Sequence, residues 1–277
     1  MSEKNIATHV LKYSAAIITG GSSGIGEAFI STLKRLNPTL AVCNISRKNT
    51  SDKQIFNISA DLSRPQDVEK ATEGVKQWLS EKVPQGRVLL INNSGFGAYG
   101  LIQDLELDNQ LSMMDLNMKA IVALTGSLLP VLMERGGAVM NVASTAAFQP
   151  TPFMTTYGAT KAFVMHWTLA LNADLDGTGV KAMCLCPGPT ATRFFTSAGF
   201  NESPLPGWVG HTSEQVAMIG LKGLAGGKTL VTCGFQNKFL CGISGKLPRV
   251  LVTRLTANTL NKFRMKALKA KKSKASA

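Results

Sequence analysis

The chain alternates short apolar segments with longer amphipathic ones, and this alternation limits the possible folds more than any other feature. Between the apolar segments lie helix-like stretches at 24–36, 65–82, 107–134 and 157–175. The apolar segments are rich in aliphatic residues and bounded by Gly, Asn or Pro, which is typical of buried parallel strands; they span 15–21, 40–46, 88–95, 137–144, 180–188 and 229–234. The pattern predicts an α/β fold, with helices on both faces of a doubly wound parallel sheet.

The length of 277 residues suits one large α/β domain. A hydrophobic content of 44% and a charged content of 17% fit a globular chain better than a disordered one. Neither an internal repeat nor a linker is visible. We therefore expect a single catalytic domain at 1–245, followed by a basic C-terminal extension at 246–277.

The composition also bears on location and metals. No apolar run reaches the roughly 18 residues that a membrane span needs, and the first residues lack the apolar core and cleavage site of a secretory signal. The five cysteines are odd in number and match no zinc-binding spacing. We interpret them as reduced, mostly buried thiols and expect a cytoplasmic protein without a metal site.

Positive charge is concentrated at the C-terminus. The net charge is +13, and 13 Lys and Arg but no acidic residue follow Glu214. Leu251, Leu255 and Leu260 have the spacing of an amphipathic helix. Such a helix is a candidate for contact with an anionic membrane or a partner, which would make the protein peripheral; the alternative is a domain-packing helix with a solvated basic end. Without interleaved aromatic residues, we expect no nucleic-acid binding.

A glycine-rich loop follows the first predicted strand and opens the first long helix. Glycines let the backbone approach a phosphate, whose negative charge the free N–H groups and dipole of a helix N-terminus favour. Loops also use glycine for its positive φ alone, but the strand–loop–helix setting favours nucleotide binding. The candidate cofactor residues in the loop are Thr19, Gly20, Ser22, Ser23, Gly24, Ile25 and Gly26.

The end of the second strand bears on which nucleotide binds. A fold of this type that prefers the non-phosphorylated dinucleotide usually places an acidic residue here for the ribose 2′-hydroxyl. This chain has Ser46 and Arg47 instead, a hydroxyl donor and a planar cationic donor that suit a 2′-phosphate. We expect NADP(H) as the cofactor; the alternative is a solvated basic turn.

Ser144, Tyr157 and Lys161 form a third pattern. Tyr157 and Lys161 are four residues apart in a helix-like stretch, so they share one helix face. A phenol has a pKa near ~10, and a neighbouring ammonium lowers the pKa by stabilising the phenolate. Taken alone, the pair is more often an ordinary amphipathic face, and a lone Ser after a strand is usually a helix cap.

In combination, these motifs resemble the short-chain dehydrogenase/reductase family over about residues 13–235. The glycine loop, the Ser…Tyr-x-x-x-Lys set and the chain order all match, with Ser94 and Ala143 as small departures. The resemblance implies a Rossmann-like fold and a homodimer or homotetramer that pairs through 116–133 and the Tyr157 helix. It adds candidate cofactor contacts at Asp61, Leu62, Asn93, Gly95, Pro187, Gly188, Thr190 and Thr192.

The resemblance also implies the catalytic roles. Tyr157 would donate the proton to a carbonyl, and Lys161 would tune Tyr157 and hold the nicotinamide ribose. Ser144 would donate a hydrogen bond to the carbonyl oxygen as charge develops there. Asn117 would anchor a water that passes protons to Lys161. The cofactor would supply the hydride.

For the substrate, the sequence indicates only that the pocket is apolar. Residues 193–212 carry Phe194, Phe195, Phe200 and Trp208 among Gly and Pro, which favours a cover over an apolar pocket, although packing of the loop into the core is the alternative. The segment 96–100 is a candidate for the opposite wall. We expect an apolar ketone or secondary alcohol, acyl-chain-like or steroid-like. Two rival functions are a catalytically silent NADP-binding scaffold or sensor and a membrane-surface protein that acts through the basic tail.

Overall fold

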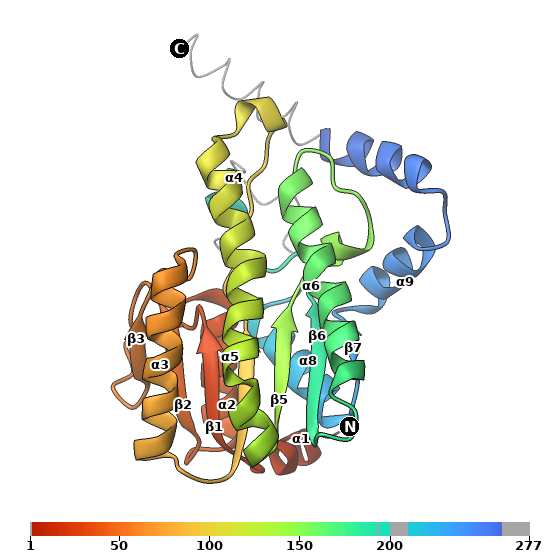
Figure 1. Cartoon of the computed structure of the whole chain (residues 1–277). Coiled ribbons are helices and arrows are strands. Elements are labelled where there is room, and N and C mark those ends of the chain that lie inside the picture. Colours follow the sequence, from red (N-terminus) through yellow and green to blue (C-terminus); the bar gives the residue numbers. More distant parts are fainter. Residues whose placement is uncertain (1, 193, 200–209, 262–277) are drawn as a thin grey trace.

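A seven-stranded parallel sheet forms the centre of the protein (Figure 1). The computed structural model describes residues 2–192, 194–199 and 210–261, apart from the side chain of Phe195. The strands run in the order β3-β2-β1-β4-β5-β6-β7, and every neighbouring pair is parallel. They are β1 Tyr13–Thr19, β2 Ala41–Ser46, β3 Phe56–Ser59, β4 Arg87–Asn92, β5 Gly137–Val142, β6 Val180–Cys186 and β7 Leu230–Thr232.

Helices cover both faces of this sheet. One layer contains α1 and α2 with α8, and the other contains α3, α5 and α6. The labelled α-helices are α1 Glu3–Val10, α2 Gly24–Leu36, α3 Pro65–Lys82, α4 Leu107–Met114, α5 Ala120–Arg135, α6 Thr155–Asp174, α7 Phe194–Ser197, α8 Ser213–Ala225 and α9 Phe235–Ser244. Shorter helical turns are η1 Ile102–Asp104, the π-helical η2 Asp115–Lys119 and η3 Thr145–Phe148. A further helix spans residues 249–261.

The two layers follow from the alternation of side chains along each strand. In β1, Ile18 packs into the core shared with α2 and α8, whereas Ile17 packs into the core shared with α3 and α5. In β4, Ile91 packs into the core shared with α2 and α8, and Leu90 packs into the core shared with α3 and α5. Strands buried on both faces read as continuous apolar runs, which is why the sequence displays them so clearly.

The predicted fold class is confirmed, and α2 and α3 begin and end at the predicted residues. The sequence interpretation missed β3 because Phe56–Ser59 is a partly exposed edge strand without an apolar run. The predicted C-terminal helix is present over 249–261, and the rest of the predicted basic extension, residues 262–277, lies outside the described residues. The predicted helix at 107–134 contains a π-helical insertion, η2, between α4 and α5.

Among the described residues, one continuous helix, Leu107–Arg135, is long and apolar enough to cross a membrane by length and composition alone. In this fold its inner face packs against the sheet through Leu124, Leu128 and Leu132. These contacts are those of a core helix in an α/β domain.

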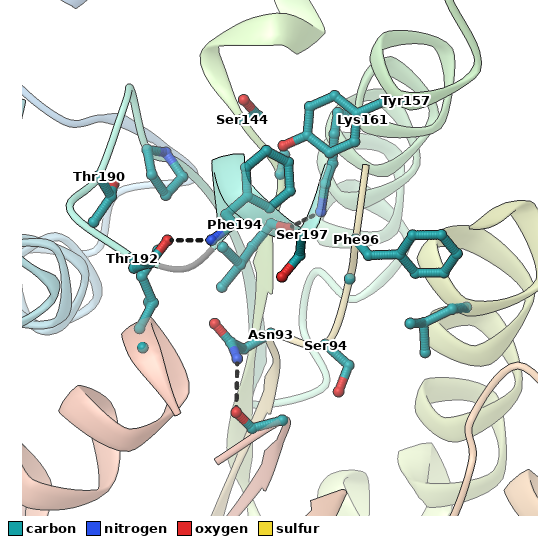
Figure 2. Close-up of a pocket in the computed structure, with 18 of the residues that line it drawn as sticks. Asn93, Ser94, Phe96, Ser144, Tyr157, Lys161, Thr190, Thr192, Phe194 and Ser197 are labelled. Atoms are coloured by element: carbon teal, nitrogen blue, oxygen red, sulfur yellow. Dashed lines mark hydrogen bonds between the residues drawn. The ribbon is translucent and has the colours of Figure 1, made fainter. Parts of the chain in front are cut away.

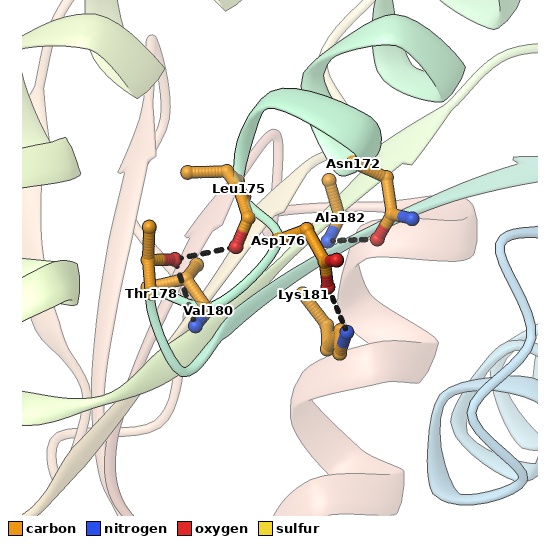
Figure 3. Close-up of polar contacts among 7 residues, drawn as sticks. All are labelled: Asn172, Leu175, Asp176, Thr178, Val180, Lys181 and Ala182. Carbon is orange, nitrogen blue, oxygen red and sulfur yellow. Dashed lines mark hydrogen bonds and ion pairs between the residues drawn. The ribbon is translucent and has the colours of Figure 1, made fainter.

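The turn from α6 into β6 is fixed by backbone-directed side chains (Figure 3). Thr178 Oγ1 donates to the Leu175 carbonyl oxygen at 2.7 Å, and Asn172 Oδ1 accepts from the Ala182 backbone nitrogen at 3.1 Å. Gly177 and Gly179 have φ values of 77° and 79°, which other residues adopt only with strain. The turn thereby fixes the register of β6, the strand that leads to the site.

All five cysteines lie within the described residues and are buried, as predicted, and the structure joins none of them in a disulfide. Cys184 and Cys186 share one face of β6, with their Sγ atoms 3.7 Å apart. Burial raises the pKa of the Cys43 and Cys233 thiols to about 12, so these thiols stay protonated at neutral pH.

Buried amides join the carboxyl ends of the central strands. Asn92 Nδ2 donates to Asn141 Oδ1 at 2.8 Å and to Thr125 Oγ1 at 3.0 Å. Asn141 Nδ2 donates in turn to Thr168 Oγ1 at 2.9 Å. The chain of bonds connects β4, β5, α5 and α6 directly below the site.

We predict that Asn141→Ala lowers the free energy of unfolding by about 1–3 kcal/mol, because it leaves buried polar groups without a partner. Urea unfolding measures the change. The control is Asn109→Ala, at an exposed position of α4, which should stay within about 0.5 kcal/mol of wild type. Equal stabilities for the two variants would contradict the role of the buried amides.

Candidate active site

A cavity of about 1050 Å³ opens at the carboxyl ends of the strands. The strand order reverses between β1 and β4, and ligands of doubly wound sheets bind at such a switch point. The predicted residues that line the cavity are Gly20, Ser22, Ser23, Gly24, Ile25, Ser46, Arg47, Asp61, Leu62, Asn93, Gly95, Ser144, Tyr157, Lys161, Pro187, Gly188, Thr190 and Thr192. The topology therefore brings most of the predicted site to one place.

Thr19 and Gly26 do not line the cavity but shape it. Thr19 Oγ1 accepts hydrogen bonds from the backbone nitrogens of Asn93 and Ser94, both at 2.9 Å. A Cβ on Gly26 would lie 2.2 Å from the Gly20 carbonyl oxygen, so α2 packs against the loop too closely for any other residue. Both residues hold the glycine loop against the end of β4.

The glycine loop leaves the N-terminus of α2 facing the cavity. Gly20 and Gly24 have φ values of 69° and 60°, and both line the cavity. Ser23 occupies the N-cap position, but its side chain makes no capping hydrogen bond. The first N–H groups of α2 and its dipole are thus directed at the cavity, an arrangement that suits a pyrophosphate.

The end of β2 supplies cations. Arg47 and Lys48 both line the cavity and are exposed. Ser46 is buried, and its hydroxyl donates to the Lys48 carbonyl oxygen at 2.5 Å. The Ser46 hydroxyl is thus already used to fix the turn, and Lys48 joins Arg47 as a candidate phosphate partner that the sequence interpretation omitted.

Asp61 lines the cavity, as do Leu62 and Arg47; its predicted adenine contact stays a prediction. Its Oδ1 accepts from Ser63 Oγ at 2.7 Å and from the Ser63 backbone nitrogen at 3.1 Å. Partial burial opposes ionisation, but these hydrogen bonds together with Arg47 and Arg64 keep the pKa of Asp61 below its ordinary value. Asp61 is therefore an anion whose acceptors are partly occupied.

Ser144, Tyr157 and Lys161 lie together on one side of the cavity, above Asn93 and Ser94 (Figure 2). Ser144 follows β5 and caps η3, where its Oγ accepts from the Ala146 backbone nitrogen at 3.1 Å. Tyr157 and Lys161 are buried on the inner face of α6. Lys161 Nζ lies 5.8 Å from the centre of the Tyr157 ring and donates to the Val142 carbonyl oxygen at 2.9 Å.

Burial opposes the expected lowering of the Tyr157 pKa by Lys161. Burial raises the pKa of Tyr157 to about 12, and the neighbouring Ser144 hydroxyl only partly offsets this effect. Burial also lowers the pKa of Lys161 to about 8. The phenol is therefore protonated at neutral pH, and the lysine is the group that titrates near the physiological range.

Asn117 stands behind the cavity wall rather than in it. It is fully buried in η2, where a π-helical turn widens the helix. Its Nδ2 donates to the Phe96 carbonyl oxygen and to Thr160 Oγ1, each at 3.0 Å, and its Oδ1 accepts from the Phe96 nitrogen at 3.2 Å. In this arrangement Asn117 fixes the segment after β4; the predicted water contact stays a prediction.

Aromatic and aliphatic side chains surround Tyr157. Phe194 of α7 contacts its ring, with centroids 5.2 Å apart, and Phe96 and Met154 line the same cavity. Phe96 belongs to the segment 96–100 predicted to line the pocket. Phe200 and Trp208, predicted to form the cover, lie outside the described residues, as does the side chain of Phe195.

The C-terminal helix supplies a wall that the sequence interpretation missed. Thr259 and Leu260 line the cavity, and Tyr99 Oη donates to the Leu260 carbonyl oxygen at 2.7 Å. Arg249 at the start of the same helix donates to the Phe148 carbonyl oxygen at 3.1 Å. These contacts join residues more than 100 positions apart, and no sequence motif signals them.

Within the described residues, no cluster of three or more His, Cys, Asp and Glu has the arrangement of a metal site. The imidazole of His211, whose backbone pairs with Thr190, has a buried Nδ1 without a hydrogen-bond partner. The charged side chains among the described residues that line the cavity are Lys161, Asp61 and the cations Arg47 and Lys48 at the end of β2.

The burial of Lys161 leads to a prediction about the stability of the fold. Its pKa is about 8 in the folded protein against an ordinary 10.5, so below pH 8 the fold must hold a charged ammonium at a cost. We predict that Lys161→Met raises the free energy of unfolding at pH 7 by roughly 2–3 kcal/mol. Between about pH 8 and 10.5 the wild type gains stability as pH rises, and the advantage of the variant disappears.

Chemical unfolding at a series of pH values measures this difference. Lys53→Met, at an exposed position, is the control and should move stability by no more than about 0.5 kcal/mol at any pH. A Lys161→Met variant that is less stable than wild type at pH 7 would show that the bond to Val142 outweighs the cost of burial.

The sequence and the fold both match known proteins. A family model described as short chain dehydrogenase matches residues 14–202. Sulfoacetaldehyde reductase 2 of Chromohalobacter salexigens is 32% identical over 190 residues, which span 64% of this chain and 73% of that protein.

Two solved structures share the fold. A short chain dehydrogenase of Burkholderia cenocepacia in complex with NADP aligns with a TM-score of 0.75 and 22% identity, covering 88% of this chain and 98% of that chain. A 3-ketoacyl-(acyl-carrier-protein) reductase of Brucella melitensis complexed with NADH aligns with a TM-score of 0.68 and 24% identity, covering 80% and 97%. At these identities the likeness concerns the fold.

Proposed function

The chain belongs to the short-chain dehydrogenase family of oxidoreductases, and on that premise we propose that it uses NADP(H) to interconvert an apolar ketone and its secondary alcohol. The observation that carries the proposal is that Ser144, Tyr157 and Lys161 lie together at the wall of a glycine-lined cavity, where burial keeps the Tyr157 phenol protonated at neutral pH. A buried, positioned acid is what proton delivery to a carbonyl oxygen requires.

The lining of the cavity supports the choice of a phosphorylated dinucleotide. The glycines and the α2 N-terminus suit the pyrophosphate, and Arg47 with Lys48 suits the 2′-phosphate. Gly95 lies between Asn117 and Lys161 so tightly that a Cβ there would come within 3.0 Å of Asn117 Oδ1 and 3.2 Å of Lys161 Nζ. When bound, NADPH supplies the hydride for the reduction.

Side chains of this protein donate the proton and stabilise the negative charge that develops during the reduction. Tyr157 donates its phenolic proton to the carbonyl oxygen, and Ser144 donates a hydrogen bond to the same oxygen as negative charge develops there. The Ser144 Oγ accepts from Ala146, which orients the hydroxyl. The Lys161 ammonium stabilises the phenolate that remains and is the nearest candidate to restore its proton.

The walls around Tyr157 favour an apolar substrate. Phe96, Met154, Phe194 and Leu260 contribute carbon surface, whereas the cations of the cavity other than Lys161 stand at the end of β2. A sulfonate such as that of sulfoacetaldehyde needs a cation beside the reacting carbonyl, and none of the described residues on this wall offers one beyond Lys161. This contrast supports a substrate unlike that of the sulfoacetaldehyde reductase.

We expect Tyr157→Phe to lower kcat for ketone reduction by ~10²–10⁴-fold, because the phenyl ring keeps the packing but loses the acid. Steady-state NADPH oxidation measures the rate. Tyr13→Phe, a buried tyrosine in β1 remote from the cavity, is the matched control and should keep full activity. Full activity of Tyr157→Phe would instead favour another acid, and no activity in the wild type would favour the silent scaffold.

Arg47→Asp should raise KM for NADPH by roughly 10–100-fold, since it replaces a charge-assisted donor to the 2′-phosphate with a repelling carboxylate. KM for NADH should stay the same or fall, because the carboxylate can accept from a free 2′-hydroxyl. Lys53→Asp controls for the change in net charge. An unchanged KM for NADPH would show that groups other than Arg47 determine the cofactor preference.

Self-association is part of the same proposal. Leu111, Val122 and Met133 on the long helix, and Phe163 on α6, are apolar and exposed, which supports pairing through these two helices in a homodimer or homotetramer. The mass in solution, measured by light scattering, distinguishes these states from a monomer.

A further inference from the structure

The last two described helices expose an unusually apolar surface. In α9, Phe235 is 83% exposed and Phe239 is 61% exposed. The helix over residues 249–261 exposes apolar side chains in its first two turns. We call this surface the C-terminal apolar face; it consists of Phe235, Phe239, Leu240 and Ile243 of α9, with Val250, Leu251 and Leu255 of the following helix.

The face is not core left incomplete, because each helix already has a buried side. Cys241 and Ser244 bury the inner side of α9, and Val252 buries that of the next helix. Phe235, Phe239 and Ile243 follow one another at intervals of four residues, so they stand along the outer side of α9. The large apolar side chains of α9 therefore face the solvent instead of the protein core.

Cations are interspersed with these apolar residues, and acids are not. Lys238, Lys246 and Arg254 are exposed beside them, and no acidic residue follows Glu214 in the sequence. A helix with exposed Phe and Leu and flanking Lys and Arg is the type that lies at a membrane interface, where anionic lipids attract the cations.

We propose that the C-terminal apolar face docks on an anionic lipid bilayer. A second copy of the chain is a weaker occupant, because it would bring two strongly cationic segments together. A polyanion such as nucleic acid would satisfy the cations but would leave the exposed Phe235 and Phe239 side chains without an apolar partner. An anionic bilayer satisfies both the charge and the apolar side chains.

The position of the face gives the docking a consequence for the active site. Both helices lie at the end of the molecule toward which the strand arrows point, in the upper right of Figure 1. The inner side of α9 packs closely against Gly188, which lines the cavity. A Cβ added to Gly188 would lie only 2.2 Å from Nδ2 of Asn237 in α9. The next helix carries Leu255 outside and, one turn later, Thr259 and Leu260 in the cavity wall.

A bilayer against this face would therefore touch the helix that walls the substrate pocket. An apolar ketone dissolved in the bilayer would then reach the pocket without crossing water. This consequence rests on the proposed function, whereas the docking itself does not.

Co-sedimentation of the full chain with vesicles tests the docking. Wild type should pellet with phosphatidylglycerol–phosphatidylcholine vesicles and not with pure phosphatidylcholine. Phe235→Ser/Phe239→Ser should weaken partitioning by about tenfold or more, since two large apolar groups no longer insert. Leu11→Ser, an apolar residue 60% exposed just after α1, is the matched control and should bind like wild type.

A charge series completes the test. Lys238→Gln/Lys246→Gln should weaken partitioning by roughly 30-fold, because each cation near an anionic surface contributes a factor of about five. Lys53→Gln/Lys82→Gln, exposed elsewhere, should change it far less. Wild-type levels of binding in the phenylalanine double variant, or no binding by wild type, would overturn the proposal.

Two further readouts separate the remaining occupants and the proposed function. A dimer whose mass in light scattering falls in Phe235→Ser/Phe239→Ser, without vesicle binding by wild type, would identify a second copy and overturn membrane docking. Vesicle binding without turnover of any ketone would retain the docking and reject the proposed function. Faster reduction of a vesicle-dissolved ketone by wild type than by the double variant would support both.

Discussion

The site depends on how tightly the ends of β1 and β4 are joined at the switch point. Thr19 Oγ1 accepts two backbone N–H groups from the segment after β4, and Asn93 Nδ2 donates back to the Thr19 carbonyl oxygen at 3.0 Å. Gly26 lets α2 close onto this junction. The N-terminal end of α2 and the wall after β5 that carries Ser144 thereby open into one cavity. A looser junction would separate the two halves of the site.

Burial sets the protonation states of Tyr157 and Lys161 in the cavity wall. It favours the neutral form of each group, so Tyr157 keeps its proton while Lys161 titrates near pH 8. The sequence spacing led us to expect the opposite effect on Tyr157, because spacing reveals the neighbour but not the loss of solvent. Proton donation in the direction of reduction suits a phenol that is protonated beforehand, with the lysine beside it to stabilise the product phenolate.

Local patterns predicted the fold well because its strands are buried on both faces and its long helices have clear ends. β3 escaped prediction because it is a short edge strand. The Ser144, Tyr157 and Lys161 set was found from motif spacing, and the structure places all three at the cavity. The wall formed by Thr259 and Leu260 was not found, since the bond from Tyr99 to Leu260 spans 161 positions. The division at residue 245 stays a prediction, and the contacts of residues 249–261 with the catalytic domain show how closely the two parts are joined.

The central claim is that Tyr157, Ser144 and Lys161 reduce an apolar ketone with hydride from NADPH. The most direct measurement is turnover of a carbonyl panel, from small anionic aldehydes to long-chain and polycyclic ketones, with NADPH and NADH compared at equal concentration. The account predicts that kcat/KM rises with the apolar surface of the ketone and is at least about tenfold higher with NADPH. Turnover restricted to small anionic carbonyls, or equal rates with both cofactors, would contradict it.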